Sequence, residues 1–492
     1  MSQQVNATSV TRNVGWSVLS KTSTFGLKFV TVPILARLLT PEEFGAVAVA
    51  LAVVQFLAMI GGAGLASALI LEPKEDEETI HSVFWANLVL ACLMAAGLYI
   101  WAEPLAEWFG AADAAYLLHL MCLLIPLQLA GDVAYALVAR RMQFSKDALW
   151  SMISESVAAI AAVIMALAGF GVWALVTQLF VSGVIRLAGL FFVSRYLPSL
   201  RFRPREVARL TRYSLGLMGS EIANFITFQS PMVVISRFLG LADAGAYSAA
   251  NRFSSIPNQV VLSAVMGVLF PAFSAMMHDR ERRSQALMLS TQVTTLLLAP
   301  MMFGLWALAK PSMLLLFGAQ WAAAWPVLGL LALSKGLLTP CSTFIPYLKG
   351  SGHGGALFWW AVGRAVVTTA AVAYGAYNGT LVEAMVALCI VNALVLVGYS
   401  WVVFRADGTP FLSGFYPSIR PMLTAALMAI VVRYALDHYL ALHVHTVLQV
   451  GLGILLGGVI YTALVVLTER PLLRKLIALV RRPKPQTAAS LP

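Results

Sequence analysis

The stretch "ARLLTPEEFGAVAVA" (36–50) places a proline and two glutamates between two long apolar runs, and "SRFLGLADAGAYSAA" (236–250) repeats its pattern. A gapless alignment of 20–50 with 220–250 matches seven residues, whereas chance predicts about two or three. The chain is therefore predicted to contain two similar halves, each with this turn between two of its helices.

The composition places these helices in a membrane. Of the 492 residues, 60% are hydrophobic and 11% are charged, and the mean hydropathy is +0.82, which excludes a domain that folds in water. A membrane-spanning helix needs about 20 mainly apolar residues. We expect about fourteen spans, with twelve as the alternative. The fourteen are 13–38, 44–71, 80–102, 115–139, 148–168, 171–195, 211–236, 245–277, 286–309, 322–348, 355–377, 381–404, 418–437 and 444–468.

A second repeated motif predicts how the halves are arranged. "WFGAADAA" (108–115) and "LFGAQWAA" (316–323) lie at the starts of the fourth and tenth spans. Six spans separate the copies of each motif, so both copies face the same side, which predicts parallel repeats related by an axis along the membrane normal. We expect an all-α integral membrane protein with two pseudo-symmetric six-helix lobes, 1–200 and 201–405, and a C-terminal helix pair with a basic tail, 406–492.

The distribution of lysine and arginine predicts the orientation. With the N-terminus in the cytoplasm, the even-numbered loops and both tails hold about 23 of the 33 basic residues, and the outside loops hold about 4. Both termini and the basic loop 194–212 are therefore predicted to be cytoplasmic, beside anionic lipids. Topology accounts for most of the net charge of +11, so we expect no nucleic-acid partner.

The opening stretch also predicts a helix start at the outer face. Thr40 is a candidate N-cap, a proline follows it, and Glu43 completes a T-x-x-E capping box. In each copy an arginine precedes an acid by six residues: Arg37 and Glu43, then Arg237 and Asp243. We weigh simple helix capping against a periplasmic gate, in which each arginine pairs with the acid of the other copy.

Four phrases extend the pattern to a known family. They are "ILARLLTPEEFGAVAVA", "GAYSAANRFSSIPNQVV", "LFPAFSAM" and "LLLFGAQWAAAWPVL". With them the chain, over roughly residues 10–405, resembles the bacterial Wzx-type polysaccharide-transporter flippases of the multidrug/oligosaccharidyl-lipid/polysaccharide exporter superfamily. The resemblance implies alternating access in the bacterial inner membrane. The cargo would be an undecaprenyl-diphosphate-linked oligosaccharide, carried to the periplasmic leaflet for exopolysaccharide, capsule or O-antigen assembly.

The same resemblance implies the partners. Besides the lipid-linked oligosaccharide and membrane lipids, a polysaccharide polymerase and chain-length proteins are candidate partners, and no cofactor is expected. The histidines near the last loop lack the ligands of a metal site, so we expect no metal either.

Polar residues on the first span predict one wall of a cavity. Ser17, Lys21, Thr24, Lys28 and Thr31 share an arc of roughly 80° on a helix. A lysine at mid-membrane needs water or a partner, so this stripe is predicted to face a hydrated cavity. Snorkelling to the cytoplasmic edge is an alternative for Lys21, whereas Lys28 lies too deep for it.

Further intramembrane cations complete the predicted diphosphate site. They are Arg186, Arg252, Lys335 and Arg364. Guanidinium forks and ammonium groups bind phosphate oxygens, so we expect these side chains in the cavity. Resemblance to the lipid II flippases, which have cavity cations on their first and eighth spans, supports Arg252 and the first-span lysines. For Arg186 and Arg364 an interhelical ion pair or hydrogen bond is an equal alternative.

Three intramembrane acids are candidates for coupling or pairing: Asp132, Glu155 and Glu221. Glu221 aligns with Lys21, so the two lobes carry opposite charges on corresponding faces. Pairing when the cavity closes is one prediction. Proton coupling through Glu155 or Glu221 is the other, because burial favours the protonated carboxyl.

The residues leave three function classes open. The excess of intramembrane bases favours an anionic cargo and a flippase, which is not an enzyme. A cation-coupled multidrug exporter of the same superfamily predicts a cavity dominated by acids and aromatics. A membrane polysaccharide polymerase or glycosyltransferase is a weak alternative, because no predicted outside loop exceeds about 15 residues.

Overall fold

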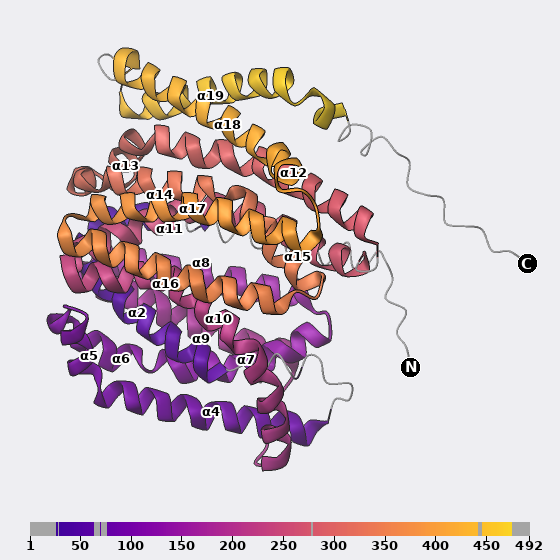
Figure 1. The fold of residues 1–492 in the computed structure, drawn as a ribbon. Helices are drawn as coiled ribbons and strands as arrows, with labels where there is room; N and C mark the ends of the chain where they lie inside the picture. The colour runs from indigo at the N-terminus through magenta and orange to yellow at the C-terminus, as the bar shows by residue number, and fades with distance from the viewer. Residues whose placement is uncertain are drawn as a thin grey trace, which may run out of the picture.

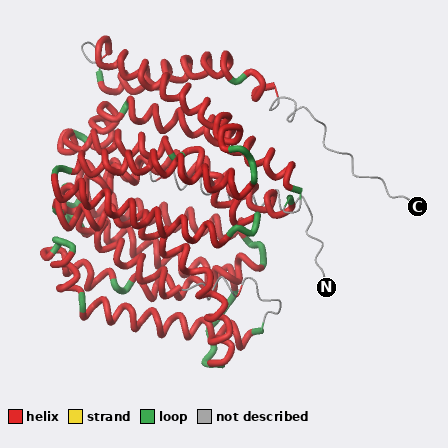
Figure 2. The backbone as a smooth tube through the Cα atoms, viewed as in Figure 1, coloured by secondary structure: helices red, strands yellow, loops and turns green. Residues whose placement is uncertain are grey.

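A computed structural model describes residues 26–27, 29–62, 69, 76–276, 279–440 and 445–474. These residues form helices joined by short connections, without a strand (Figure 2). The first described helix is Phe29–Leu38. Those of the first half are α2 (Pro41–Gly62), α4 (Glu77–Ile100), α5 (Ala102–Trp108), η1 (Ala112–Ala114), α6 (Ala115–Met121), α7 (Leu124–Arg140), α8 (Phe144–Leu167) and α9 (Trp173–Ser194).

The second half repeats this order and is followed by an extra pair. Its helices are α10 (Pro204–Leu239), α11 (Leu241–Ala275), α12 (Arg280–Ala307), α13 (Ala309–Phe317), η2 (Ala319–Ala324), α14 (Trp325–Leu337), η3 (Thr339–Thr343), α15 (Phe344–Gly350), α16 (Gly354–Asn378) and α17 (Leu381–Asp407). The extra pair is α18 (Phe411–Ala435), extended by the π-helix η4 (Leu436–Leu440), and α19 (Thr446–Thr468).

The expected count of fourteen spans is not confirmed. In the described part of the chain eleven helices are long and apolar enough to cross a membrane, or twelve when Ala319–Leu337 and Thr339–Gly350 form one span bent by 55°. The expected span 13–38 lies mostly outside the described residues. The expected span 245–277 corresponds to α11, which has 35 residues but carries polar residues from Asn251 onward.

The two repeated turns meet where the two halves pack against each other. A Cβ atom on Gly45 of α2 would overlap the carbonyl of Leu241, and one on Gly245 of α11 would overlap the carbonyl of Pro41. The same built atoms would lie 3.0 Å from the backbone nitrogen of the opposite glycine. These contacts are reciprocal and join aligned positions, so α2 and α11 cross with approximate two-fold symmetry. Only glycine permits so close a backbone approach.

Packing elsewhere repeats between the halves. Helix α4 contacts α7 and α8 contacts α9, and α12 contacts α14 and α16 contacts α17 in the same relation. Figure 1 shows the first half in indigo to purple, the second in magenta to orange, and α18 and α19 in light orange to yellow at one edge. The extra pair packs on α12, where Tyr461 of α19 donates a hydrogen bond to the Leu296 carbonyl (2.8 Å).

Candidate functional site

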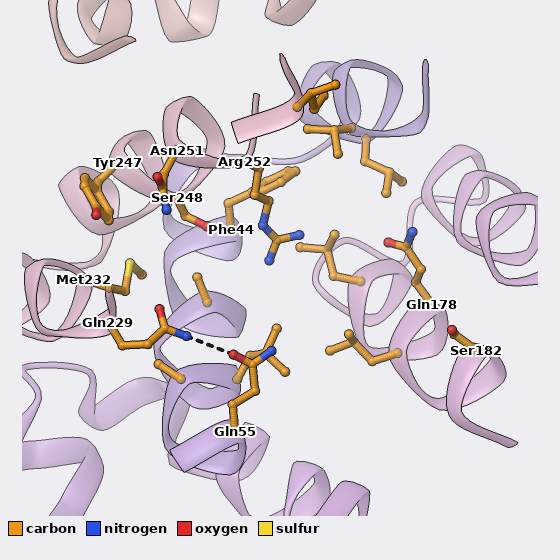
Figure 3. Close-up of a pocket in the computed structure, with 18 of the residues that line it drawn as sticks. Phe44, Gln55, Gln178, Ser182, Gln229, Met232, Tyr247, Ser248, Asn251 and Arg252 are labelled. Carbon is orange, nitrogen blue, oxygen red and sulfur yellow. Dashed lines mark hydrogen bonds between the residues drawn. The ribbon is translucent and has the colours of Figure 1, made fainter. Parts of the chain in front are cut away.

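A polar cavity of about 440 Å³ lies between the two halves. It is lined from the first described helix, α2, α8 and α9 of the first half and from α10 and α11 of the second. Figure 3 shows side chains of α2, α9, α10 and α11 surrounding it. Phe44 and Tyr247, which lie close to Gly45 and Gly245 in the chain, are among the lining residues, so the crossing borders the cavity at the end predicted to be periplasmic.

Arg252 is the cation that the described structure brings to this cavity. Its guanidinium extends from α11 into the open space (Figure 3). Within the described residues it has neither a hydrogen-bond nor an ion-pair partner, whereas an arginine removed from water is stable only when paired or hydrated. The cavity therefore offers five N–H donors and a positive charge to an anion.

Neutral amides and hydroxyls make up most of the remaining polar lining. Gln229 of α10 donates to Gln55 of α2 (2.9 Å), which links the two halves inside the cavity (Figure 3). Sequence reasoning missed this feature, although an amide inside an apolar span is a readable signal. The other polar lining residues are Gln178, Ser182, Ser248, Asn251 and Gln259.

Glu155 lines the same cavity from α8, so one of the three predicted acids reaches it. The predicted lysines of the first span, Lys21 and Lys28, lie outside the described residues, and their part in the site stays a prediction. Thr31 of the predicted stripe is buried and donates to the carbonyl of Leu27 in its own helix.

Lys335 does not line the cavity, contrary to the sequence-based expectation. Its Nζ lies within hydrogen-bond distance of four oxygens of α11: the Asn251 carbonyl (3.1 Å), Asn251 Oδ1 (2.8 Å), Ser254 Oγ (2.8 Å) and Ser255 Oγ (2.7 Å). Helix α14 packs against α11, so the ammonium reaches these acceptors before it can reach the cavity. Lys335 thus fastens the helical turn that carries Arg252.

Arg186 and Arg364 also lie outside the cavity lining. Arg186 of α9 forms an ion pair with Asp147 of α8 (2.6 Å) and donates to the Asp147 carbonyl (2.9 Å). Arg364 of α16 lies over the ring of Phe228 of α10, with 5.6 Å from its guanidinium carbon to the ring centroid. Arg186 therefore forms the interhelical ion pair that the sequence left open as an alternative. Arg364 instead meets its neighbouring helix through the aromatic ring, and neither arginine joins the two halves.

The other two acids are likewise elsewhere. Glu221 of α10 pairs with Lys349 of α15 (3.1 Å), so its described ion pair is within the second half and not between the halves. Asp132 of α7 lies against Gly62 of α2 and is not part of the cavity lining. Of the three predicted acids, only Glu155 therefore lines the cavity.

At the face predicted to be periplasmic, Arg37 joins the two halves. It donates from Nε to the Leu316 carbonyl (3.0 Å) and from Nη2 to the Leu315 carbonyl. These carbonyls end α13, where helical acceptors lack partners within the helix. Arg37 therefore bonds to helix-end carbonyls and not to Asp243.

Helix η2 of the second half also donates hydrogen bonds to the first half. Trp321 donates from its indole to the Ala36 carbonyl (2.6 Å), and Gln320 donates to the carbonyls of Ala36 (2.5 Å) and Leu39 (3.1 Å). Trp321 is buried, and its ring meets that of Phe44 edge to face at 5.4 Å. We call the contacts of residues 36–39 with 315–321 the first outer contact.

A second outer contact joins the other copy of each motif: the turn of the second half and the "FGA" motif of the first half. Ser236 donates from its hydroxyl to the Phe109 carbonyl (2.9 Å). A Cβ on Gly110, whose φ is +70°, would lie 3.0 Å from the Ser236 carbonyl. Each repeated turn therefore contacts the "FGA" motif of the opposite half. The symmetry predicted from the sequence recurs as two related contacts.

Glu43 forms the predicted capping box. Thr40 N–H donates to Glu43 Oε2 (2.8 Å), and Glu43 N–H donates to Thr40 Oγ1 (3.3 Å). The other carboxyl oxygen of Glu43 accepts from Val172 N–H (3.0 Å). The gate pairs of the alternative reading, Arg37 with Asp243 and Arg237 with Glu43, are not formed among the described residues, because backbone groups bind Arg37 and Glu43 instead.

Cavity, crossing helices and outer contacts together define a polytopic membrane protein of the transporter type. The chain belongs to the family described as polysaccharide biosynthesis protein, which matches residues 34–326. It is 71% identical over 488 residues, 99% of both chains, to the succinoglycan biosynthesis transport protein ExoT of Rhizobium meliloti (strain 1021). It is 24% identical over 322 residues to the lipopolysaccharide biosynthesis protein WzxC of Escherichia coli (strain K12), covering 64% of this chain and 65% of WzxC.

Solved structures share the fold. The lipid II flippase MurJ, in an inward closed conformation, superposes with a TM-score of 0.74 at 16% identity, covering 93% of this chain and 99% of MurJ. An inward-facing multidrug transporter of the MATE family has a TM-score of 0.63 at 16% identity, covering 79% of this chain and 95% of the transporter. The fold is therefore that of the exporter superfamily that the sequence resembles.

Proposed function

We propose that this protein is a flippase that moves an undecaprenyl-diphosphate-linked oligosaccharide from the cytoplasmic to the periplasmic leaflet of the bacterial inner membrane. The observation that carries the proposal is Arg252, an unpartnered arginine among the described residues, in a cavity whose other polar lining residues are mainly amides and hydroxyls. The near-identical length and 71% identity to a succinoglycan transport protein favour the repeat unit of a succinoglycan-type polysaccharide as the cargo.

Each part of this cargo has a matching group in the cavity. Arginine N–H donors bind phosphate oxygens through charge-assisted hydrogen bonds. Amide side chains donate and accept at once, as sugar hydroxyls do, and the cavity contains Gln55, Gln178 and Gln229. The isoprenoid tail stays in the lipid, and the protein transports without catalysing a reaction on its cargo.

The outer contacts support a cytoplasm-facing state. The glycine crossing borders the cavity, and both outer contacts join the halves at the face predicted to be periplasmic. We propose that residues 1–200 and 201–405 rock as two lobes, and that both outer contacts break when the cavity opens to the periplasm. Residues 406–492 form the added helix pair and tail, and both termini are cytoplasmic.

The test removes the cavity charge. Arg252→Ala is expressed in a strain that lacks its own succinoglycan transporter, and secreted polysaccharide is measured alongside the amount of folded protein in the membrane. We expect export to fall about ten- to a hundredfold, because the charge-assisted hydrogen bonds to the diphosphate are lost. Arg470→Ala, which changes an exposed arginine beyond α19, is the matched control and should export normally.

Export by Arg252→Ala at the level of the wild-type protein contradicts the diphosphate site. The drug-exporter alternative makes the opposite prediction, because a cavity arginine repels organic cations: its removal should increase cation efflux and leave polysaccharide unchanged. Secretion by the wild-type chain in the deficient strain separates this alternative from the flippase.

A further inference from the structure

A second pocket, of about 530 Å³, lies between the first turn of α8 and the last turn of α9, at the face predicted to be cytoplasmic. It lies on the outside of the first half and does not belong to the central cavity. Two cations and several aromatic or apolar side chains line it, among them Lys146, Trp150, Phe192, Arg195, Tyr196 and Leu197.

The aromatic wall of this pocket is rigidly held. Trp150 of α8 lies flat on α9 because position 189 is glycine, where a Cβ would approach the indole to 2.6 Å. The Trp150 and Phe192 ring centroids are 5.8 Å apart. Tyr196 is buried, and its hydroxyl is 3.0 Å from His81 Nδ1. The pocket is therefore formed before any ligand arrives.

The two cations of the pocket are unpaired among the described residues. Neither Lys146 nor Arg195 has an ion-pair or hydrogen-bond partner in the part of the chain that the structure describes, and both are exposed. Three acids of α4, α8 and α10 are engaged by other arginines: Asp147 by Arg186 (2.6 Å), Glu206 by Arg209 (3.0 Å) and Glu78 by Arg203. Two like charges on one pocket repel each other unless an anion lies between them.

The backbone at Arg195 adds a second observation. Arg195 caps α9 with φ 51° and ψ 30°, a left-handed conformation that favours glycine. Asparagine or glycine usually occupies such a cap. From this position Arg195 lines the pocket.

Apolar side chains beside the cations face the lipid. Phe192 is 73% exposed and Leu197 is 82% exposed, at the level where the membrane-spanning part of α9 ends. A site with cations on one side and exposed apolar groups on the other matches a molecule with an anionic head and hydrocarbon chains.

We propose that the Lys146–Arg195 pocket binds the phosphate headgroup of an anionic glycerophospholipid of the cytoplasmic leaflet. Arg195 and Lys146 donate to the phosphate oxygens, Trp150 lies at the interface beside the glycerol, and the acyl chains run along Phe192. The bound lipid neutralises the pocket and holds the cytoplasmic ends of α8 and α9 together. This site is independent of the cargo and of the flippase proposal.

The test measures lipid binding to the full-length protein in neutral detergent by native mass spectrometry, with phosphatidylglycerol as the probe. Phosphatidylcholine and inorganic phosphate are the comparison ligands. We expect phosphatidylglycerol to bind the wild-type protein and to bind the Lys146→Gln/Arg195→Gly double variant about tenfold more weakly, because two interfacial cations are lost. Glycine suits the left-handed position, so Arg195→Gly should fold at least as well as the wild-type protein.

Arg205→Gln is the matched control, because Arg205 is exposed at the same membrane edge and does not line the pocket. It should bind phosphatidylglycerol like the wild-type protein. Four results would overturn the proposal: equal binding by the double variant, an equal loss in Arg205→Gln, equal binding of phosphatidylcholine, or binding of inorganic phosphate as tight as that of phosphatidylglycerol. If the double variant does not fold, Arg195→Gly alone decides the same question.

Discussion

At the scale of single residues, similar intramembrane cations have different roles. Arg252 and Lys335 both lie within predicted spans of the second half. Arg252 extends into the cavity, whereas Lys335 is surrounded by the oxygens of Asn251, Ser254 and Ser255 on α11. The ammonium is satisfied by these oxygens, so it orients the turn that presents Arg252 and does not bind cargo itself.

Lys335→Met tests this positioning role. Methionine keeps the apolar stem but removes every hydrogen bond of the ammonium group. We therefore expect the free energy of unfolding to fall by about 1–3 kcal/mol and export to fall as well. The thermal midpoint of the purified protein and polysaccharide export are measured together. Arg252→Ala should reduce export with little change in thermal midpoint, and this difference separates cargo binding from positioning. An unchanged midpoint for Lys335→Met would refute the anchor.

At the scale of elements, the outer contacts join helix ends. The carbonyls that end Phe29–Leu38 accept from η2, and those that end α13 accept from Arg37. Helix-end carbonyls accept no hydrogen bond within their own helix. Their hydrogen bonds to the other half can therefore break and reform without unwinding the helix. A rocking motion therefore breaks a few hydrogen bonds between the halves and leaves every helix intact.

Trp321→Phe is expected to loosen the first outer contact. Phenylalanine keeps much of the ring packing but cannot donate to Ala36, which removes about 0.5–1.5 kcal/mol of the contact. To measure this, the four native cysteines are replaced and a single reporter cysteine is introduced into the cavity by Ser248→Cys. Labelling of that cysteine from outside by an impermeant reagent should rise about two- to tenfold.

Trp108→Phe is the control for this experiment. Trp108 belongs to the corresponding motif of the first half, but it is 60% exposed and forms no hydrogen bond among the described residues. The cysteine at position 248 should be labelled at the same rate in this variant as in the protein that keeps both Trp108 and Trp321. If Trp321→Phe labels no faster than Trp108→Phe, the first outer contact does not restrict opening to the periplasm.

At the scale of the whole molecule, the orientation rests on the basic residues. The loop between α9 and α10 and the C-terminal tail are both predicted to be cytoplasmic. Fusions after residue 205 and after residue 485 should therefore be active with a cytoplasmic reporter and inactive with a periplasmic one. A periplasmic signal at either position would reverse the faces assigned to the cavity, the outer contacts and the lipid pocket.

The amino-acid sequence by itself determined the membrane class, the repeated halves, the capping box at Thr40 and Glu43, and the family. These properties depend on composition or on residues within a few positions of one another, so one chain read in order reveals them. The repeat also aligned Gly45 with Gly245 in the sequence. The sequence did not predict that these two glycines would contact each other.

Only the tertiary structure decided which polar residues meet. In the structure Arg252 lines the cavity, whereas Lys335 and Arg186 contact neighbouring helices. It also joined Arg37 to carbonyls about 280 positions away and not to Asp243. The physical reason is that a buried charge is satisfied by whichever acceptor helix rotation and packing bring within reach, and backbone carbonyls leave no mark in the sequence.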